Sequence, residues 1–209
     1  GIDFGTSNSA VAIGSGGKVS LVQLENKSVT IPTAVFFNVE EGRIVFGREA
    51  VTEYLDGYSG RLMRSLKSIL GSDLILDATQ IGHKKINFSE IIGLFIGHIK
   101  AVSEKKIGTS CENVVIGRPV FFVDNDDVAD RRAENELKAI ALAQGFKNIS
   151  FEFEPIAAAR DYESVIEHEE LVLVVDIGGG TSDFSLIRLS PESRYKDDRT
   201  ADILANAGV

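Results

Sequence analysis

Two short segments of the chain place an aspartate, glycine and hydroxyl residues directly after an apolar run. The first is Ile2-Asp3-Phe4-Gly5-Thr6-Ser7, and the second is Val175-Asp176-Ile177-Gly178-Gly179-Gly180-Thr181-Ser182. Glycine lets the backbone approach a phosphate closely, and threonine hydroxyls donate further hydrogen bonds. The aspartates repel phosphate but suit Mg²⁺, which takes carboxylate and water ligands. One such turn is ordinary hairpin sequence, whereas two copies in the same residue order predict a polyphosphate gripped from both sides.

Two further charged residues join this pattern. Glu154 precedes Pro155 at a predicted helix start, where the helix dipole favours an acidic residue. Its functional interpretation is a third carboxylate near the metal ion or its waters. Lys67 lies in a predicted basic helix over residues 61–70, and taken alone a solvated helix face is the simpler interpretation.

Charge and composition exclude several classes of partner. Lysine and arginine number 22 against 31 acidic residues, which gives a net charge of −9. An acidic surface repels nucleic acids and anionic membranes, so neither is an expected partner. The most apolar runs, 91–99 and 171–177, are about half the length of a spanning helix. A single cysteine, Cys111, allows no internal disulfide or zinc site, and we expect a reducing, cytoplasmic location.

The first half of the chain predicts hairpins followed by helices. Glycine-rich turns separate two pairs of strands, 9–13 with 19–24 and 33–37 with 43–46. Apolar residues at helical spacing then predict helices over 49–55, 61–70 and 87–106.

The second half alternates strands with helices. The expected strands cover 113–117, 149–153, 171–176 and 184–189, and the expected helices cover 126–144 and 155–167. We interpret the acids at 124–130 as a helix start, because they lack the spacing of a calcium loop. Alternation of this kind is typical of an α/β fold, and the opening hairpins make its sheet mixed.

These motifs carry a family resemblance. Gly1-Ile2-Asp3-Phe4-Gly5-Thr6-Ser7-Asn8-Ser9 resembles the first phosphate motif of the seventy-kilodalton heat-shock (DnaK-type) chaperones, and the segment 174–183 resembles the second. Glu154-Pro155-Ile156-Ala157-Ala158-Ala159 resembles the family's connection between them. Thr30-Ile31-Pro32-Thr33 and Lys67-Ser68-Ile69-Leu70-Gly71 also fall in the family's order, so the anchors run from Gly1 to Asp183.

The resemblance implies a ribonuclease-H-like, actin-like ATPase fold, with a mixed sheet flanked by helices. Residues 1–33 with 112–209 would form the core of a first lobe, and 34–111 an inserted smaller α/β subdomain. The chain opens without methionine and stops at Val209 without a terminating pattern, so we expect both ends to be cut from a longer protein. With the second lobe absent, we expect the isolated lobe to bind nucleotide weakly and to be inactive alone.

The family's functional residues are carried over by motif. Asp3, Glu154 and Asp176 would arrange Mg²⁺ through water, and the phosphates of ATP or ADP would contact Gly5, Thr6, Ser7, Asn8, Gly178, Gly179, Gly180 and Thr181. The expected catalytic residues are Lys67, Glu154, Asp176 and Asp183. Lys67 would orient the attacking water near the γ-phosphate, and Asp183 would bind a monovalent cation such as K⁺ or polarise water. The implied chemistry is positioning and electrostatic stabilisation.

The sequence departs from the family pattern at several places. Ile116-Gly117-Arg118-Pro119 replaces an apolar lead to the family's switch proline, and Ile156 replaces a threonine. The segment after Pro119 is longer than usual, which leaves the proline's arginine partner open between Arg131 and Arg132. The pattern is closer to the short YegD-type branch, whose members lack the usual peptide-binding domain. We therefore expect co-chaperones or protein clients as partners but assign no particular one.

Three rival classes remain from the sequence. A bacterial actin-like filament protein of the MreB kind shares both phosphate turns, but the Lys67 motif and the long segment at 87–106 count against it. A sugar or acetate kinase needs a catalytic aspartate aimed at a substrate hydroxyl, and no residue is singled out for that function. A pseudo-ATPase is disfavoured because all three acids are present.

Overall fold

The structure, a computed structural model, describes residues 1–179 and 182–208. The chain divides into two compact units, one formed by residues 1–116 and 121–150, the other by 117–120 and 151–209. Each is described by itself. The sequence predicts a different division, with an inserted subdomain at 34–111, which the two compact units do not test.

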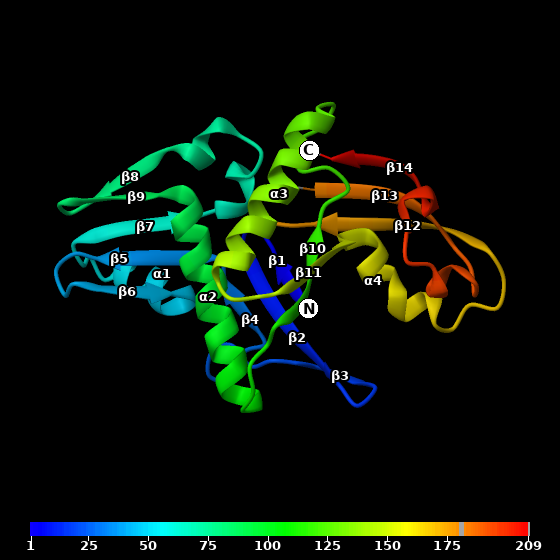
Figure 1. Ribbon diagram of the computed structural model, residues 1–209, viewed down its shortest axis with the longest axis horizontal. Coiled ribbons are helices and arrows are strands. Elements are labelled where there is room, and N and C mark those ends of the chain that lie inside the picture. Colours follow the sequence, from blue (N-terminus) through cyan, green and yellow to red (C-terminus); the bar gives the residue numbers. More distant parts are fainter. Residues whose placement is uncertain (180–181, 209) are drawn as a thin grey trace. The chain divides into compact units, whose positions relative to one another are not determined.

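A mixed sheet lies mostly within the first unit (Figure 1). Its strands lie in the order β11-β10-β1-β2-β3, and β4 also pairs with β2. The strand β1 runs parallel to β10 and antiparallel to β2, as the predicted mixed sheet requires. The bounds are β1 (Ile2–Phe4), β2 (Asn8–Ser15), β3 (Lys18–Leu21), β4 (Thr30–Pro32), β10 (Asn113–Arg118) and β11 (Asn148–Phe153).

The predicted second hairpin is confirmed within a three-stranded antiparallel sheet. The strand β5 (Ala34–Asn38) is buried throughout and lies between β6 (Arg43–Phe46) and β7 (Gly60–Arg64). The helix α1 (Gly47–Leu55) covers this sheet, where Ala50 packs with Phe36 and Val45. A separate pair, β8 (Ala78–Ile81) and β9 (Lys84–Asn87), completes the strands of this region.

The helix predicted over residues 61–70 is wrong. Residues 60–64 form β7, which pairs with β5 along its whole length, and Ser65 then adopts a left-handed φ of 55°. A short 3₁₀ helix, η1 (Leu66–Ile69), carries Lys67, and a second one follows as η2 (Asp73–Leu76). The spacing of the leucines suggested an α-helix, but the structure buries Leu66 and Leu70 in and directly after the 3₁₀ helix η1. Sheet pairing overrides local propensity here.

Two long helices have nearly the predicted ends. The helix α2 (Phe88–Ile107) begins after Asn87, whose N–H donates to Glu90 Oε2 at 3.2 Å, and ends at Gly108 with a φ of 73°. The helix α3 (Asp127–Ala143) starts after Asp126, whose Oδ1 accepts hydrogen bonds from the N–H groups of two following residues at 3.1 and 2.9 Å. The acids at 124–130 therefore do start a helix, as expected.

The second unit is a three-stranded antiparallel sheet with one helix against it. The strands are β12 (Glu170–Ile177), β13 (Ser182–Leu189) and β14 (Ile203–Gly208), in that order. The helix α4 (Glu154–Glu163) ends four residues before the predicted end. Two short 3₁₀ turns, η3 (Ser193–Tyr195) and η4 (Thr200–Asp202), lie between β13 and β14. Among the described residues, no helix is both long enough and apolar enough to cross a membrane.

His98 in α2 gives the first unit a pH-dependent contribution to stability. Its ring stacks on Phe46 with the centroids 4.2 Å apart. Burial lowers the pKa of His98 from 6.5, against the opposing influence of Glu25 and Glu49. The unfolded chain therefore binds the proton more readily, so stability present above pH 6.5 is lost as the pH falls.

We expect the free energy of unfolding to decrease less between pH 7.5 and pH 5 in His98→Gln than in the parent chain. Urea unfolding at a series of pH values measures this difference. The exposed His83 supplies the control, His83→Gln, which should keep the parent pH dependence. Identical pH profiles for His98→Gln and the parent chain would contradict the expectation.

Candidate functional site

The first glycine turn joins β1 to β2 in the first unit. Asp3 lies in β1 opposite Ala10, and Gly5 follows the strand directly. A Cβ at Gly5 would lie 2.2 Å from the carbonyl oxygen of Asn8, so the turn closes too tightly for any other residue. The predicted contact residues Thr6 and Ser7 lie within this turn, and Asn8 begins β2.

Thr33 holds this turn from the side. Its Oγ1 donates to the carbonyl of Gly5 at 2.8 Å, and its N–H donates to the carbonyl of Ser7 at 2.9 Å. The side chain is buried and also lies 2.9 Å from Ser9 Oγ. The sequence placed Thr33 in a motif but did not predict its contact with the glycine turn, because Thr33 and Gly5 are 28 positions apart.

The second glycine turn joins β12 to β13 in the second unit. The strands pair in register, with Asp176 opposite Asp183 and Ile177 opposite Ser182. Gly178 and Gly179 follow β12 as predicted, whereas the predicted phosphate contacts Gly180 and Thr181 lie outside the described residues.

One face of this sheet is apolar at one end and polar at the other. At one end, Val172, Val174, Ile187 and Leu189 pack with Ile156 and Ala159 of α4. At the other end, the same face presents Asp176, Asp183 and Ser185, because side chains two residues apart share a face. This polar end lines a cavity of about 230 Å³.

Residues from several elements of the second unit complete this cavity. Glu154, the first residue of α4, lies on its wall together with Pro155 and Ala158. Pro119 and Val120 line it from the segment after β10, and Asn206 lines it from β14. Three of the predicted catalytic residues, Glu154, Asp176 and Asp183, thus share one cavity.

Two of the predicted charged site residues, Asp3 and Lys67, belong to the first unit. Asp3 is exposed in β1, and Lys67 is half-buried in η1. In the part of the chain that the structure describes, no group of three or more histidine, cysteine, aspartate or glutamate side chains could hold a metal ion.

Comparison with known families decides the family of this chain. A family profile described as Hsp70 protein matches residues 1–195, nearly the whole sequence. The chain belongs to the Hsp70 family. Family membership implies a nucleotide-binding lobe of the chaperone-type ATPase, and both glycine turns, Lys67 and Glu154 lie within the matched residues.

Arg118 lies directly before the cavity residue Pro119, and the sequence analysis named it only as a departure from the family pattern. Its side chain is buried, with Nε donating to the carbonyl of Pro119 at 3.1 Å and Nη2 donating to that of Val120 at 3.2 Å. The guanidinium carbon also lies 5.2 Å from the ring centroid of Phe153, directly before Glu154. Arg118 therefore braces both the cavity wall at Pro119 and the start of α4.

Two residues that line the cavity, Ser185 and Asn206, were not predicted from the sequence. Ser185 Oγ donates to Asn206 Oδ1 at 2.6 Å, which ties β13 to β14 beside Asp183. The position of Ser185 two residues after Asp183 is a signal that could have been used, because it places both on one face. No strand was predicted at 203–208, so Asn206 carried no comparable signal.

Proposed function

We propose that this chain provides Mg²⁺-dependent ATP binding and hydrolysis for a chaperone-like protein of the DnaK or YegD type. The turn after Asp3 and the turn after Asp176 would each contact phosphate groups. The single observation that supports this best is the cavity beside the second turn, which gathers the carboxylates of Glu154, Asp176 and Asp183.

The carboxylates of the cavity suit a divalent ion held through its water ligands, and that ion would offset their repulsion of phosphate. Oxygen donors predominate among its polar groups, which is the donor type that Mg²⁺ prefers. Its volume of about 230 Å³ is below the roughly 300–1,000 Å³ of pockets that enclose a whole small-molecule ligand. The cavity is therefore suited to the phosphate end of a nucleotide, and the base would be bound elsewhere. This is why we expect the 209-residue chain alone to bind nucleotide weakly.

The charged residues divide among three proposed functions. When bound, Mg²⁺ neutralises phosphate charge and polarises the transferred group. Asp3, Glu154 and Asp176 would hold its water ligands, and Asp183 would bind a monovalent cation such as K⁺ or polarise water. Lys67 would place a positive charge near the γ-phosphate and orient the attacking water.

Features around Pro119 support the YegD-type branch in particular. The buried arginine before this proline replaces an apolar residue of the usual pattern, and Ile156 replaces a threonine. We therefore propose a cytoplasmic, chaperone-like ATPase and leave the classes of client and co-chaperone unassigned.

Hydrolysis by the full-length protein tests this proposal. We expect ATP turnover that requires Mg²⁺ and stops with a chelator, and that falls about 100-fold or more in Asp176→Asn. Asp161→Asn, an exposed carboxylate of α4, is the matched control and should leave turnover unchanged. ATP-dependent pelleting of the protein would favour an actin-like filament instead, and turnover independent of Asp176 would count against the proposed site.

A further inference from the structure

Gly71, four residues after Lys67, is gripped by two side chains of α3. Its N–H donates to Glu136 Oε2 at 3.0 Å, and its carbonyl oxygen accepts a hydrogen bond from Arg132 Nη2. Arg132 Nη1 also donates to Asp73 Oδ1 at 3.1 Å. Both polar backbone groups of one glycine are thus satisfied by charged side chains from a distant segment, in an arrangement that we call the Gly71 grip.

The grip is built for glycine alone. Gly71 has a φ of 77°, and a Cβ there would lie 2.8 Å from Val123 Cγ2, 3.0 Å from the carbonyl oxygen of Ala129 and 3.1 Å from Ala133 Cβ. The small side chains of α3 let the loop backbone approach the helix closely. The loop backbone at Gly71 therefore packs directly against α3.

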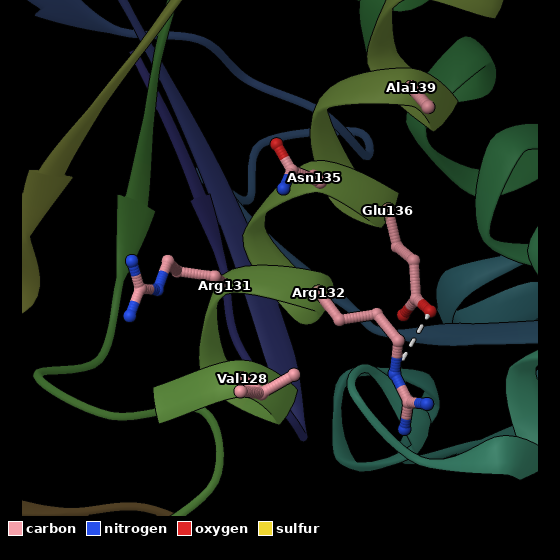
Figure 2. A pocket seen from close by; sticks show the side chains of 6 residues that line it. All are labelled: Val128, Arg131, Arg132, Asn135, Glu136 and Ala139. Carbon is pink, nitrogen blue, oxygen red and sulfur yellow. Dashed lines mark ion pairs between the residues drawn. The ribbon is translucent and has the colours of Figure 1, made fainter. Parts of the chain in front are cut away.

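The two gripping residues lie one helical turn apart and support each other. Figure 2 shows Arg132 and Glu136 extending from the same side of α3, with an ion pair between Arg132 Nε and Glu136 Oε1 at 3.8 Å. Arg131 extends from the other side of the helix, and its Nε donates to the carbonyl of Asp127 within α3. The two neighbouring arginines therefore make different contacts, and only Arg132 is bonded to Gly71.

The helix α3 is longer and better capped than the 3₁₀ turn η1 that carries Lys67. The helix α3 has 17 residues, a capped start, and Ala133 and Leu137 fully buried. By contrast, η1 has four residues, and the segment around it is closed by hydrogen bonds of 3.2 Å between residues three apart, including Leu70 N–H to the carbonyl of Lys67. Short 3₁₀ turns are weak on their own. The buried side chains of Leu66 and Leu70 anchor the segment at 65–72, and the Gly71 grip fixes the backbone at its C-terminal end.

We propose that Arg132 and Glu136 are positioning residues for Lys67, which act by fixing Gly71 and hence the 3₁₀ turn that carries the lysine. The inference rests on the proposed function, because it assumes that Lys67 assists hydrolysis. Arg132 and Glu136 do not contact the reacting groups in this account. Their effect on hydrolysis passes through the backbone of residues 67–71.

Amide hydrogen exchange tests the grip without reference to activity. In Glu136→Ala, the Gly71 amide should exchange about tenfold faster or more, since its acceptor is lost. Glu136→Gln keeps an acceptor oxygen and should restore most of the protection. Lys138→Ala, an exposed residue of the same helix, is the control. Unchanged exchange of Gly71 in Glu136→Ala would overturn the grip.

Single-turnover hydrolysis by the full-length protein tests the effect on Lys67. Arg132→Ala and Glu136→Ala should each lower the rate about 10- to 100-fold and leave the Kd for ATP within about twofold. Arg132→Lys should recover only part of the rate, because an ammonium group cannot donate to Gly71 and Asp73 in the same fork. Lys138→Ala should match the parent protein.

A double-mutant cycle separates this inference from the proposed function. In a Lys67→Ala background, adding Arg132→Ala should cause no further loss, because both changes remove the same contribution. A further loss of equal size would show that Arg132 acts independently of Lys67 and would overturn the inference alone. If Lys67→Ala itself leaves hydrolysis unchanged, the proposed function of Lys67 fails and the inference fails with it.

Discussion

Lys67→Ala in the full-length protein is expected to lower ATP hydrolysis about 100-fold while ATP affinity stays within about twofold. The lysine is half-buried in a short 3₁₀ turn whose neighbours Leu66 and Leu70 are buried. Its charge is thus carried by an anchored backbone rather than by a mobile loop. Such a charge stabilises the transition state more than bound ATP, so the rate should fall and the affinity should not.

Single-turnover rates and equilibrium titration measure the two quantities separately. Arg64→Ala is the matched control, because Arg64 is an exposed basic residue three positions earlier, at the end of β7. The Arg64→Ala protein should hydrolyse ATP at the parent rate. Unchanged turnover in Lys67→Ala would remove this residue from the mechanism, and a large loss of affinity would reassign it to nucleotide binding.

Glu163→Ala is expected to destabilise the second unit by about 3–5 kcal/mol, the cost of breaking a buried ion pair on one side. Glu163 accepts two hydrogen bonds from Arg199 at 2.7 and 3.1 Å, and both side chains are 1% exposed. Asp202 binds the same guanidinium at 2.6 Å. The pair joins the end of α4 to the segment before β14, so its loss leaves a buried cation with one partner.

Urea unfolding measures the change in the free energy of unfolding. Amide exchange of β12 to β14 assigns this change to the second unit if the two units unfold separately. Glu169→Ala is the control, since Glu169 pairs with Arg188 at 3.6 Å with both side chains well exposed. That change should cost less than about 1 kcal/mol. Replacing Glu163, Arg199 and Asp202 together with uncharged residues of similar size should cost less than Glu163→Ala, because the charge of this cluster that remains, Lys196, is well exposed. Equal losses in Glu163→Ala and Glu169→Ala would contradict the expectation.

The elements that the sequence predicts well are those with both a periodic pattern and end signals. The helix α2 combines an apolar stripe with Asn87 before it and Gly108 after it, and its ends fall within one residue of the prediction. The hairpin of β5 and β6 was predicted from its apolar strands and the turn before Arg43. In both cases local chemistry and tertiary packing favour the same structure.

Elements that depend on distant partners were predicted poorly. Residues 61–64 carry a helical pattern but pair with β5, and the strand β14 has a weak apolar pattern. At the candidate site, the acids Glu154, Asp176 and Asp183 stand out as residue types, and the structure places them around one cavity. Arg118 and Thr33 act through backbone carbonyls, a contact that residue spacing does not encode.

Calorimetric titration of Mg·ATP into the full-length protein, parent and Asp176→Asn side by side, tests the central claim most directly. The account predicts saturable binding by the parent protein and an affinity at least about tenfold lower in the variant, because Asp176 lies at the proposed phosphate and metal cavity. The Asp161→Asn control should bind like the parent. No binding by the parent protein, or equal binding by parent and Asp176→Asn, would contradict the account.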